Sequence, residues 1–199
     1  MLFVAVQLLD VGWSTLVLGG VEKVRIVPHF TASNSLDLYF MPYTHSLLGA
    51  VAWSVGAFLL YRVLARKATS VAALVVGAAV FSHWVLDLLV HRPDLSLYDD
   101  TAKVGFGLWN YPAIELPLEL LLLCAGLGLY LRSGGTRRLG MIVFAVLMAA
   151  VQVINFLAPP PRSDRAAATA ALVAYVVLAA IAGVLERVAR RAPRAAVQW

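Results

Sequence analysis

The chain has 199 residues, of which 61% are hydrophobic and 14% are charged, and its formal net charge at pH 7 is +5. Soluble domains carry about 25% charged residues, so this composition, with a mean hydropathy of +0.83, excludes a soluble enzyme and a disordered chain. The single cysteine, Cys124, excludes an internal disulfide. The basic residues stand at the ends of apolar segments, where they orient membrane helices, and we predict no nucleic-acid partner.

Runs of about 20 apolar residues, the length that crosses roughly 30 Å of hydrocarbon, predict six membrane spans. The first contains Asp10 and has no basic region before it, so we expect a retained helix and not a signal peptide. The runs lack the alternating pattern of a membrane β-barrel. We therefore predict an all-α, polytopic transmembrane helical bundle that forms a single domain. Its spans cover residues 2–20, 44–65, 69–90, 109–131, 139–158 and 166–188, followed by a cytoplasmic tail at 189–199.

The Lys and Arg residues that flank these spans are unevenly divided between the two sides of the membrane. One side holds ten of them: Arg62, Arg66, Lys67, Arg132, Arg137, Arg138, Arg187, Arg190, Arg191 and Arg194. The other side holds six: Lys23, Arg25, Arg92, Lys103, Arg162 and Arg165. The positive-inside rule places the richer side in the cytoplasm, so both termini are predicted to be cytoplasmic. Two of the three outer connections, 21–43 and 91–108, are then long, and long ordered loops are often functional.

Polar side chains inside the predicted spans are the main functional signal. An ionised group near the bilayer centre costs roughly 2.5 to 3.5 kcal/mol, so each must be paired, protonated or bound to something. Four carboxylates lie within the spans: Asp10, Asp87, Glu115 and Glu119. The histidines fall in the outer loops or the outer halves of spans: His29, His45, His83 and His91.

The densest polar signal is the pair His83 and Asp87, which share one helix face because they are four residues apart. His45 begins the preceding span at a similar depth, so two antiparallel helices would bring all three side chains together. Two imidazoles and a carboxylate suit a divalent transition metal, zinc above all, with an open position for water. From spacing alone, a structural hydrogen-bonded pair or a proton relay fits equally well.

Other polar residues are candidates for supporting roles. Asp10 orients a ligating imidazole, binds the metal directly, or is neutral and hydrogen-bonded to a neighbour. Glu115 is a candidate general base, with a structural polar contact as the alternative. Asp10 and Glu115 are thus the candidate catalytic residues. His91 and Asp94 are candidate additional ligands or supporting groups, and the alternative for them is a solvated loop.

Two motifs stand at the ends of neighbouring spans: His45-Ser46 opens one, and Ser82-His83-Trp84-Val85-Leu86-Asp87 closes the next. In these motifs the chain resembles the bacterial membrane-bound metal-dependent hydrolase family, and the similarity covers roughly residues 9–131. The resemblance implies metal ligation by the two histidines and Asp87 in a bacterial inner membrane. Similar proteins begin with a short Gly-His segment, whereas this chain has no histidine before His29, so Asp10, His91 or water would complete the site.

These observations predict a membrane-embedded metal-dependent hydrolase. A metal ion, zinc above all, would activate water to cleave an ester or phosphoester bond, and a membrane lipid or another amphipathic molecule is the expected substrate. The alternative is a small permease or proton-coupled carrier in which Asp10, Asp87 and Glu119 exchange protons. Against the carrier, the sequence has no repeat symmetry and no pair of discontinuous helices. A third interpretation is a non-enzymatic scaffold with a structural metal.

Overall fold

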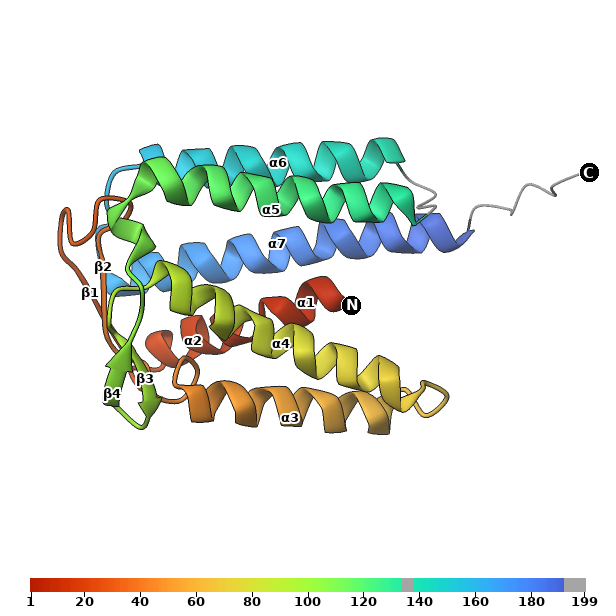
Figure 1. The fold of residues 1–199 in the computed structure, drawn as a ribbon, viewed down its shortest axis with the longest axis horizontal. Helices are drawn as coiled ribbons and strands as arrows, with labels where there is room; N and C mark the ends of the chain where they lie inside the picture. Colours follow the sequence, from red (N-terminus) through yellow and green to blue (C-terminus); the bar gives the residue numbers. More distant parts are fainter. Residues whose placement is uncertain (134–137, 192–199) are drawn as a thin grey trace, which may run out of the picture.

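The structure is a computed structural model that describes residues 1–133 and 138–191. Its helices run side by side, and the short strands and long loops gather at one end of the bundle (Figure 1). The helices are α1 (Leu2–Val6), α2 (Leu8–Leu18), α3 (Leu47–Leu64), α4 (Ser70–Val90), α5 (Pro112–Arg132), α6 (Arg138–Leu157) and α7 (Asp164–Arg191). The predicted all-α, polytopic helical bundle is therefore confirmed.

In the described ranges, five helices are long and apolar enough to cross a membrane: α3, α4, α5, α6 and α7 as far as Arg187. The chain is therefore a membrane protein. The predicted span at 2–20 is not one continuous helix, because α1 and α2 meet at Gln7, whose φ of −91° and ψ of 2° lie outside the helical range. The predicted tail also begins later, since α7 runs to Arg191, and residues 192–199, like Arg137, lie outside the described residues.

The starts of α3 and α4 are fixed by side-chain caps. The Ser46 hydroxyl accepts a hydrogen bond from the Gly49 backbone N–H, and Thr69 accepts one from Ala72 in the same way. Because Ser46 caps α3, His45 lies in the turn before the helix and not in its first turn. A Cβ at Gly49 would lie 2.8 Å from the Tyr43 carbonyl oxygen, so only glycine allows this turn to fold so tightly over the helix.

The two long connections, at residues 21–43 and 91–108, are ordered by small antiparallel sheets, which the sequence analysis did not predict. β1 (Lys23–Ile26) pairs with β2 (Leu36–Phe40), and β3 (Leu95–Tyr98) pairs with β4 (Thr101–Val104). The β1–β2 register places Arg25 opposite Asp37, and their side chains form an ion pair of 2.6 Å. A 3-10 turn, η1 (Leu108–Asn110), then delays the start of α5 to Pro112, a residue suited to the first position of a helix.

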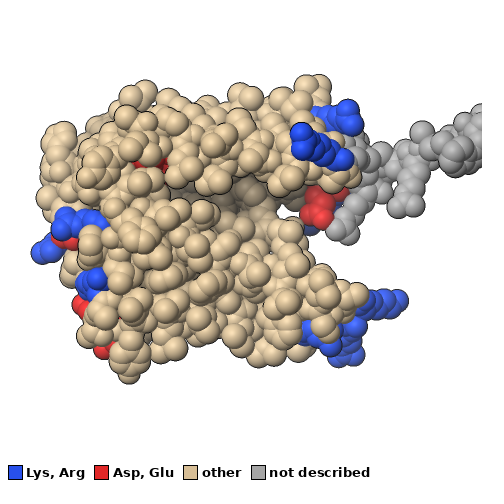
Figure 2. Space-filling view, viewed as in Figure 1, with Lys and Arg blue, Asp and Glu red and all other residues tan. Residues whose placement is uncertain are grey.

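The buried apolar residues form two groups that meet at Leu88 and Val104. One group lies among α1, α2, α3 and α4, and the other joins α2 to the outer strands and to Ala168 of α7. Figure 2 shows most Lys and Arg side chains at the two ends of the molecule, with a largely uncharged band between them and a hollow between its upper and lower parts. This distribution is the one expected for a bundle that crosses a membrane.

Candidate metal centre

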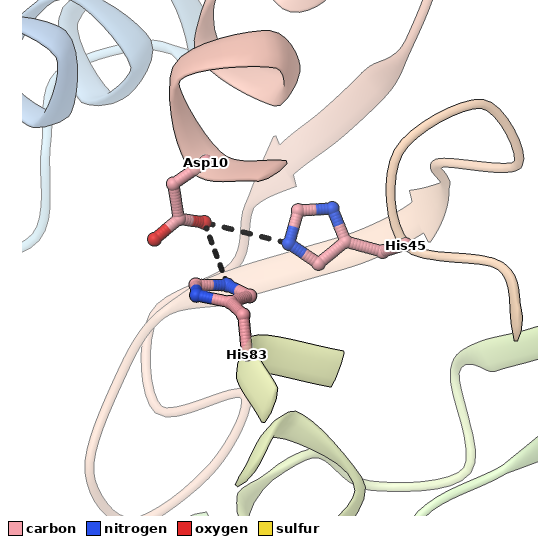
Figure 3. A group of neighbouring side chains, drawn as sticks. All are labelled: Asp10, His45 and His83. Carbon is pink, nitrogen blue, oxygen red and sulfur yellow. Dashed lines mark ion pairs between the residues drawn. The ribbon is translucent and has the colours of Figure 1, made fainter. Parts of the chain in front are cut away.

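Three elements bring one polar side chain each to a common point (Figure 3). Asp10 comes from the first turn of α2, His45 from the turn before α3, and His83 from the second half of α4. The Nε2 atoms of the two histidines each lie 3.4 Å from Oδ1 of Asp10. Each residue offers one ligand atom to a group in which all three atoms lie within 4.8 Å of one another. Asp10 therefore lies directly against both imidazoles. Of the roles considered for it, this position fits direct binding of a metal.

Asp87 approaches the same two imidazoles. Its Oδ2 atom lies 3.2 Å from Nε2 of His83, one helical turn earlier on α4, and 3.6 Å from Nε2 of His45. This oxygen is buried and has no hydrogen-bond partner within the described parts of the chain. A buried carboxylate oxygen without a partner is costly, so its position calls for a positively charged neighbour.

The four nitrogen-to-oxygen separations fit ligands of one ion better than direct hydrogen bonds. Charge-assisted N–H···O bonds are usually about 2.7 to 2.9 Å long, whereas the separations here are 3.2 to 3.6 Å. Two atoms that each lie about 2.0 to 2.2 Å from a zinc ion, at the tetrahedral angle, are roughly 3.3 to 3.6 Å apart. Nitrogen and carboxylate oxygen are also ligands that zinc accepts. Asp10, His45 and His83 therefore fit the ligand set of a divalent transition metal, whereas Asp87 approaches both imidazoles but is not part of that group among the described residues.

A buried chain of hydrogen bonds fixes the orientation of the His45 ring. The Thr44 hydroxyl donates to Oε2 of Glu22 at 2.7 Å and lies 2.7 Å from Nδ1 of His45. Because the hydroxyl proton goes to Glu22, Thr44 accepts from His45, whose proton must then sit on Nδ1. The lone pair of Nε2 is left facing Asp10, as metal ligation requires.

Glu22 is the anchor of this chain of hydrogen bonds. Its Oε1 atom accepts the backbone N–H groups of Tyr43 and Thr44, each at 2.9 Å. Burial raises the pKa of Glu22, while its hydrogen bonds with Thr44 act in the opposite direction. On the other side of the turn, the Trp84 indole donates to the His45 carbonyl oxygen at 2.9 Å. The turn that carries His45 is thus held by Glu22 on one side and by Trp84 on the other.

His91 and Asp94 form a separate buried pair beside the centre. Nδ1 of His91 lies 2.8 Å from Oδ1 of Asp94, and the imidazole ring packs against Trp109 at a tilt of 40°, with 4.1 Å between centroids. The His91 ring centroid lies 6.3 Å from that of His45. Both residues are buried, so the solvated-loop alternative for them is wrong. In the part of the chain that the structure describes, the ligand group contains neither of them.

Glu115 is buried in the first turn of α5, where it accepts a hydrogen bond from the Ser33 hydroxyl. This contact ties the loop between β1 and β2 to α5, which is the kind of structural polar contact considered as the alternative to a general base. Glu119, one turn further along, accepts a hydrogen bond from Gln152 of α6. Among the described residues, neither glutamate belongs to the group formed by the two imidazoles and Asp10.

Three contributors to the centre were missed by the sequence analysis. The sequence analysis gives Thr44 and Glu22 no role, and they are 22 residues apart, so only the fold brings them together. Tyr175 of α7, whose hydroxyl interacts with the Asp10 carboxylate, is also remote in sequence. The position of Thr44 directly before a candidate ligand was the one available signal.

Comparisons of the chain with protein-family models, with curated proteins and with solved structures each gave no match. The resemblance to membrane-bound metal-dependent hydrolases therefore rests on short sequence motifs alone. What the protein does has to be argued from the geometry of the centre.

Proposed function

We propose that the chain is a membrane-embedded, metal-dependent hydrolase that cleaves an ester or phosphoester bond of a membrane lipid. The observation that carries the proposal is the convergence of Asp10, His45 and His83 at ligand-like separations, with Asp87 beside the same two imidazoles. The resemblance to the bacterial membrane-bound metal-dependent hydrolases, whose motifs include His45 and His83, points to the same class of reaction. Zinc is the metal that best suits two imidazoles and carboxylate oxygens.

The metal ion and the protein would make different contributions to hydrolysis. When bound, a divalent ion supplies a water of lowered pKa and polarises the oxygen of the group to be cleaved. The chain supplies two imidazoles that bind in the neutral form, and Thr44 keeps the proton of His45 on Nδ1. Asp10 and Asp87 supply two negative charges that balance the ion, which favours a divalent cation in a region of low dielectric constant.

The depth of the centre supports a lipid substrate. Asp87 lies about one helical turn before α4 ends at Val90, and His45 directly precedes the cap of α3. Both positions correspond to the level at which lipid head groups meet the hydrocarbon. The distribution of Lys and Arg supports an orientation with both termini in the cytoplasm and the centre at the outer face. The resemblance supports a bacterial inner membrane.

The proposal predicts chelator-sensitive hydrolysis by the purified protein in liposomes. Release of fatty acid or of a phosphorylated head group should cease when the metal is removed, because both the nucleophilic water and the polarising charge are lost. Added zinc should restore it. The matched control is His29→Ala, which removes an exposed histidine of the outer loop and should leave hydrolysis unchanged.

Two results would contradict hydrolysis. Chelator-insensitive proton or solute transport that Asp87→Asn abolishes would favour a carrier. Thermal stabilisation by zinc, with no turnover of any ester or phosphoester, would favour a scaffold with a structural metal.

A further inference from the structure

An apolar groove of about 700 Å³ lies between α1 and α3. Val4 and Ala5 of α1, Leu8 of α2, and Gly56 and Leu60 of α3 are among the residues that line it. Because α3 is one of the helices long and apolar enough to cross a membrane, the groove is surrounded by the hydrocarbon of the bilayer. Its occupant must therefore be apolar.

The groove is long enough for one lipid chain. The residues of α3 that line it extend from Ala52 to Leu64, which corresponds to about 18 Å of helix. They recur at helical spacing and so form one stripe along α3. One leaflet of the bilayer contributes roughly half of the 30 Å hydrocarbon thickness, so an acyl chain that leaves the head-group level can lie along this stripe.

The outer end of the groove adjoins the candidate metal centre. Tyr43 lines the groove, and its backbone N–H donates to Glu22, the residue that positions Thr44 and His45. Trp53 also lines the groove and donates from its indole to the Tyr43 carbonyl oxygen at 3.0 Å. The same turn of the chain therefore forms both the end of the groove and one side of the centre.

Trp53 and α2 also link the groove to the candidate metal centre. A Cβ at Gly12 would lie 3.1 Å from the Trp53 ring and 3.2 Å from the Thr44 side chain, so the indole packs where α2 passes the centre. Leu8, which lines the groove, stands two residues before Asp10 on α2. A chain in the groove thus reaches the elements that carry two of the candidate ligands.

We infer that this groove binds one acyl chain of a membrane glycerolipid and presents the lipid's ester or phosphoester bond to the metal centre. The inference rests on the proposed hydrolase function, since it identifies the lipid substrate's binding site. It explains why an apolar groove ends at a polar centre, because the lipid's tail would lie in the groove while its scissile bond lies at the centre.

Gly56→Leu tests the inference because it adds an apolar side chain to the lining of the groove at a position where a Cβ meets open space. Among the described residues, nothing lies within 4 Å of a Cβ built at Gly56 or at Gly126, an exposed glycine of α5 outside the groove. In phosphatidylethanolamine and phosphatidylglycerol vesicles, Gly56→Leu should raise the KM for long-chain lipid at least tenfold. It should change hydrolysis of a short-chain ester less than twofold, and Gly126→Leu should change neither. If Gly56→Leu and Gly126→Leu have the same KM for long-chain lipid, the groove does not bind the acyl chain.

A binding measurement separates failure of the groove from failure of the hydrolase. A phospholipid with a photoreactive group in its acyl chain should label peptides of α1 and α3 even in the His83→Ala background, where no turnover is expected. Gly56→Leu should reduce this labelling at least fivefold, and Gly126→Leu should not. Labelling that follows this pattern without hydrolysis of any lipid would support the groove and contradict the hydrolase. If the protein hydrolyses lipid but Gly56→Leu does not reduce labelling, the acyl chain does not bind in the groove, and the hydrolase proposal is unaffected.

Discussion

Replacement of His83 by alanine is expected to remove the bound metal and the hydrolytic activity together. His83 supplies one of two imidazoles, and its Nε2 atom lies 3.4 Å from Asp10 and 3.2 Å from Asp87. Loss of a partner that only orients a ligand typically weakens metal binding 10 to 100-fold, so loss of the ligand itself should weaken zinc binding by more than about 100-fold. Hydrolysis should fall by the same factor or more at limiting zinc.

Zinc affinity can be measured by competition with a chelator of known affinity, alongside hydrolysis of lipid vesicles. His29→Ala is the control for loss of a histidine far from the centre, and it should bind zinc like the unaltered chain. Asp87→Asn keeps the shape of the side chain while removing its charge, so it distinguishes loss of a ligand from loss of packing. If His83→Ala retains zinc at unaltered affinity and stoichiometry, the centre proposed here does not exist.

Thr44→Val is expected to weaken zinc binding 10 to 100-fold while leaving all four candidate ligands in place. Valine has nearly the shape of threonine but cannot accept the Nδ1 proton of His45 or donate to Glu22. Both the tautomer and the orientation of the ring are then less well fixed. Glu22→Gln should have an effect of similar size, because its amide must replace a carboxylate that accepts three hydrogen bonds.

A double-mutant cycle of Thr44→Val and Glu22→Gln tests whether the two residues act as one unit. If they act through the same hydrogen bond, the double variant should bind zinc about as weakly as either single variant. The control is Thr15→Val, which removes an exposed hydroxyl that only bonds the Val11 carbonyl oxygen on α2. An affinity for zinc in Thr44→Val equal to that in Thr15→Val would show that the hydrogen-bond chain does not position His45.

The sequence predicted the long helices well because their signal is local and strong. Spans such as α3 and α4 need only a run of apolar residues of sufficient length. The break at Gln7 was not predictable in the same way, since neither proline nor glycine marks it. The two small sheets were missed because strands of four or five residues are too short to show a clear alternating pattern.

The candidate site shows the same division between local and remote contacts. The meeting of His83 and Asp87 follows from their spacing on one helix, and that of His45 and His83 from the antiparallel packing of α3 against α4. The choice among the roles of Asp10 needed the fold, because it depends on how α2 lies against both histidines. The contact of Glu22 with Thr44 depends on the ordered turn between them, which no sequence pattern predicts.

Zinc K-edge X-ray absorption of the purified chain tests the central claim most directly. The arrangement of Asp10, His45, His83 and Asp87 predicts about one zinc per chain, with the multiple-scattering signature of two imidazoles and with nitrogen or oxygen ligands at about 2.0 to 2.2 Å. The imidazole signature should disappear in His83→Ala. A protein without bound metal above the His83→Ala level, or a zinc spectrum without imidazole, would contradict the account.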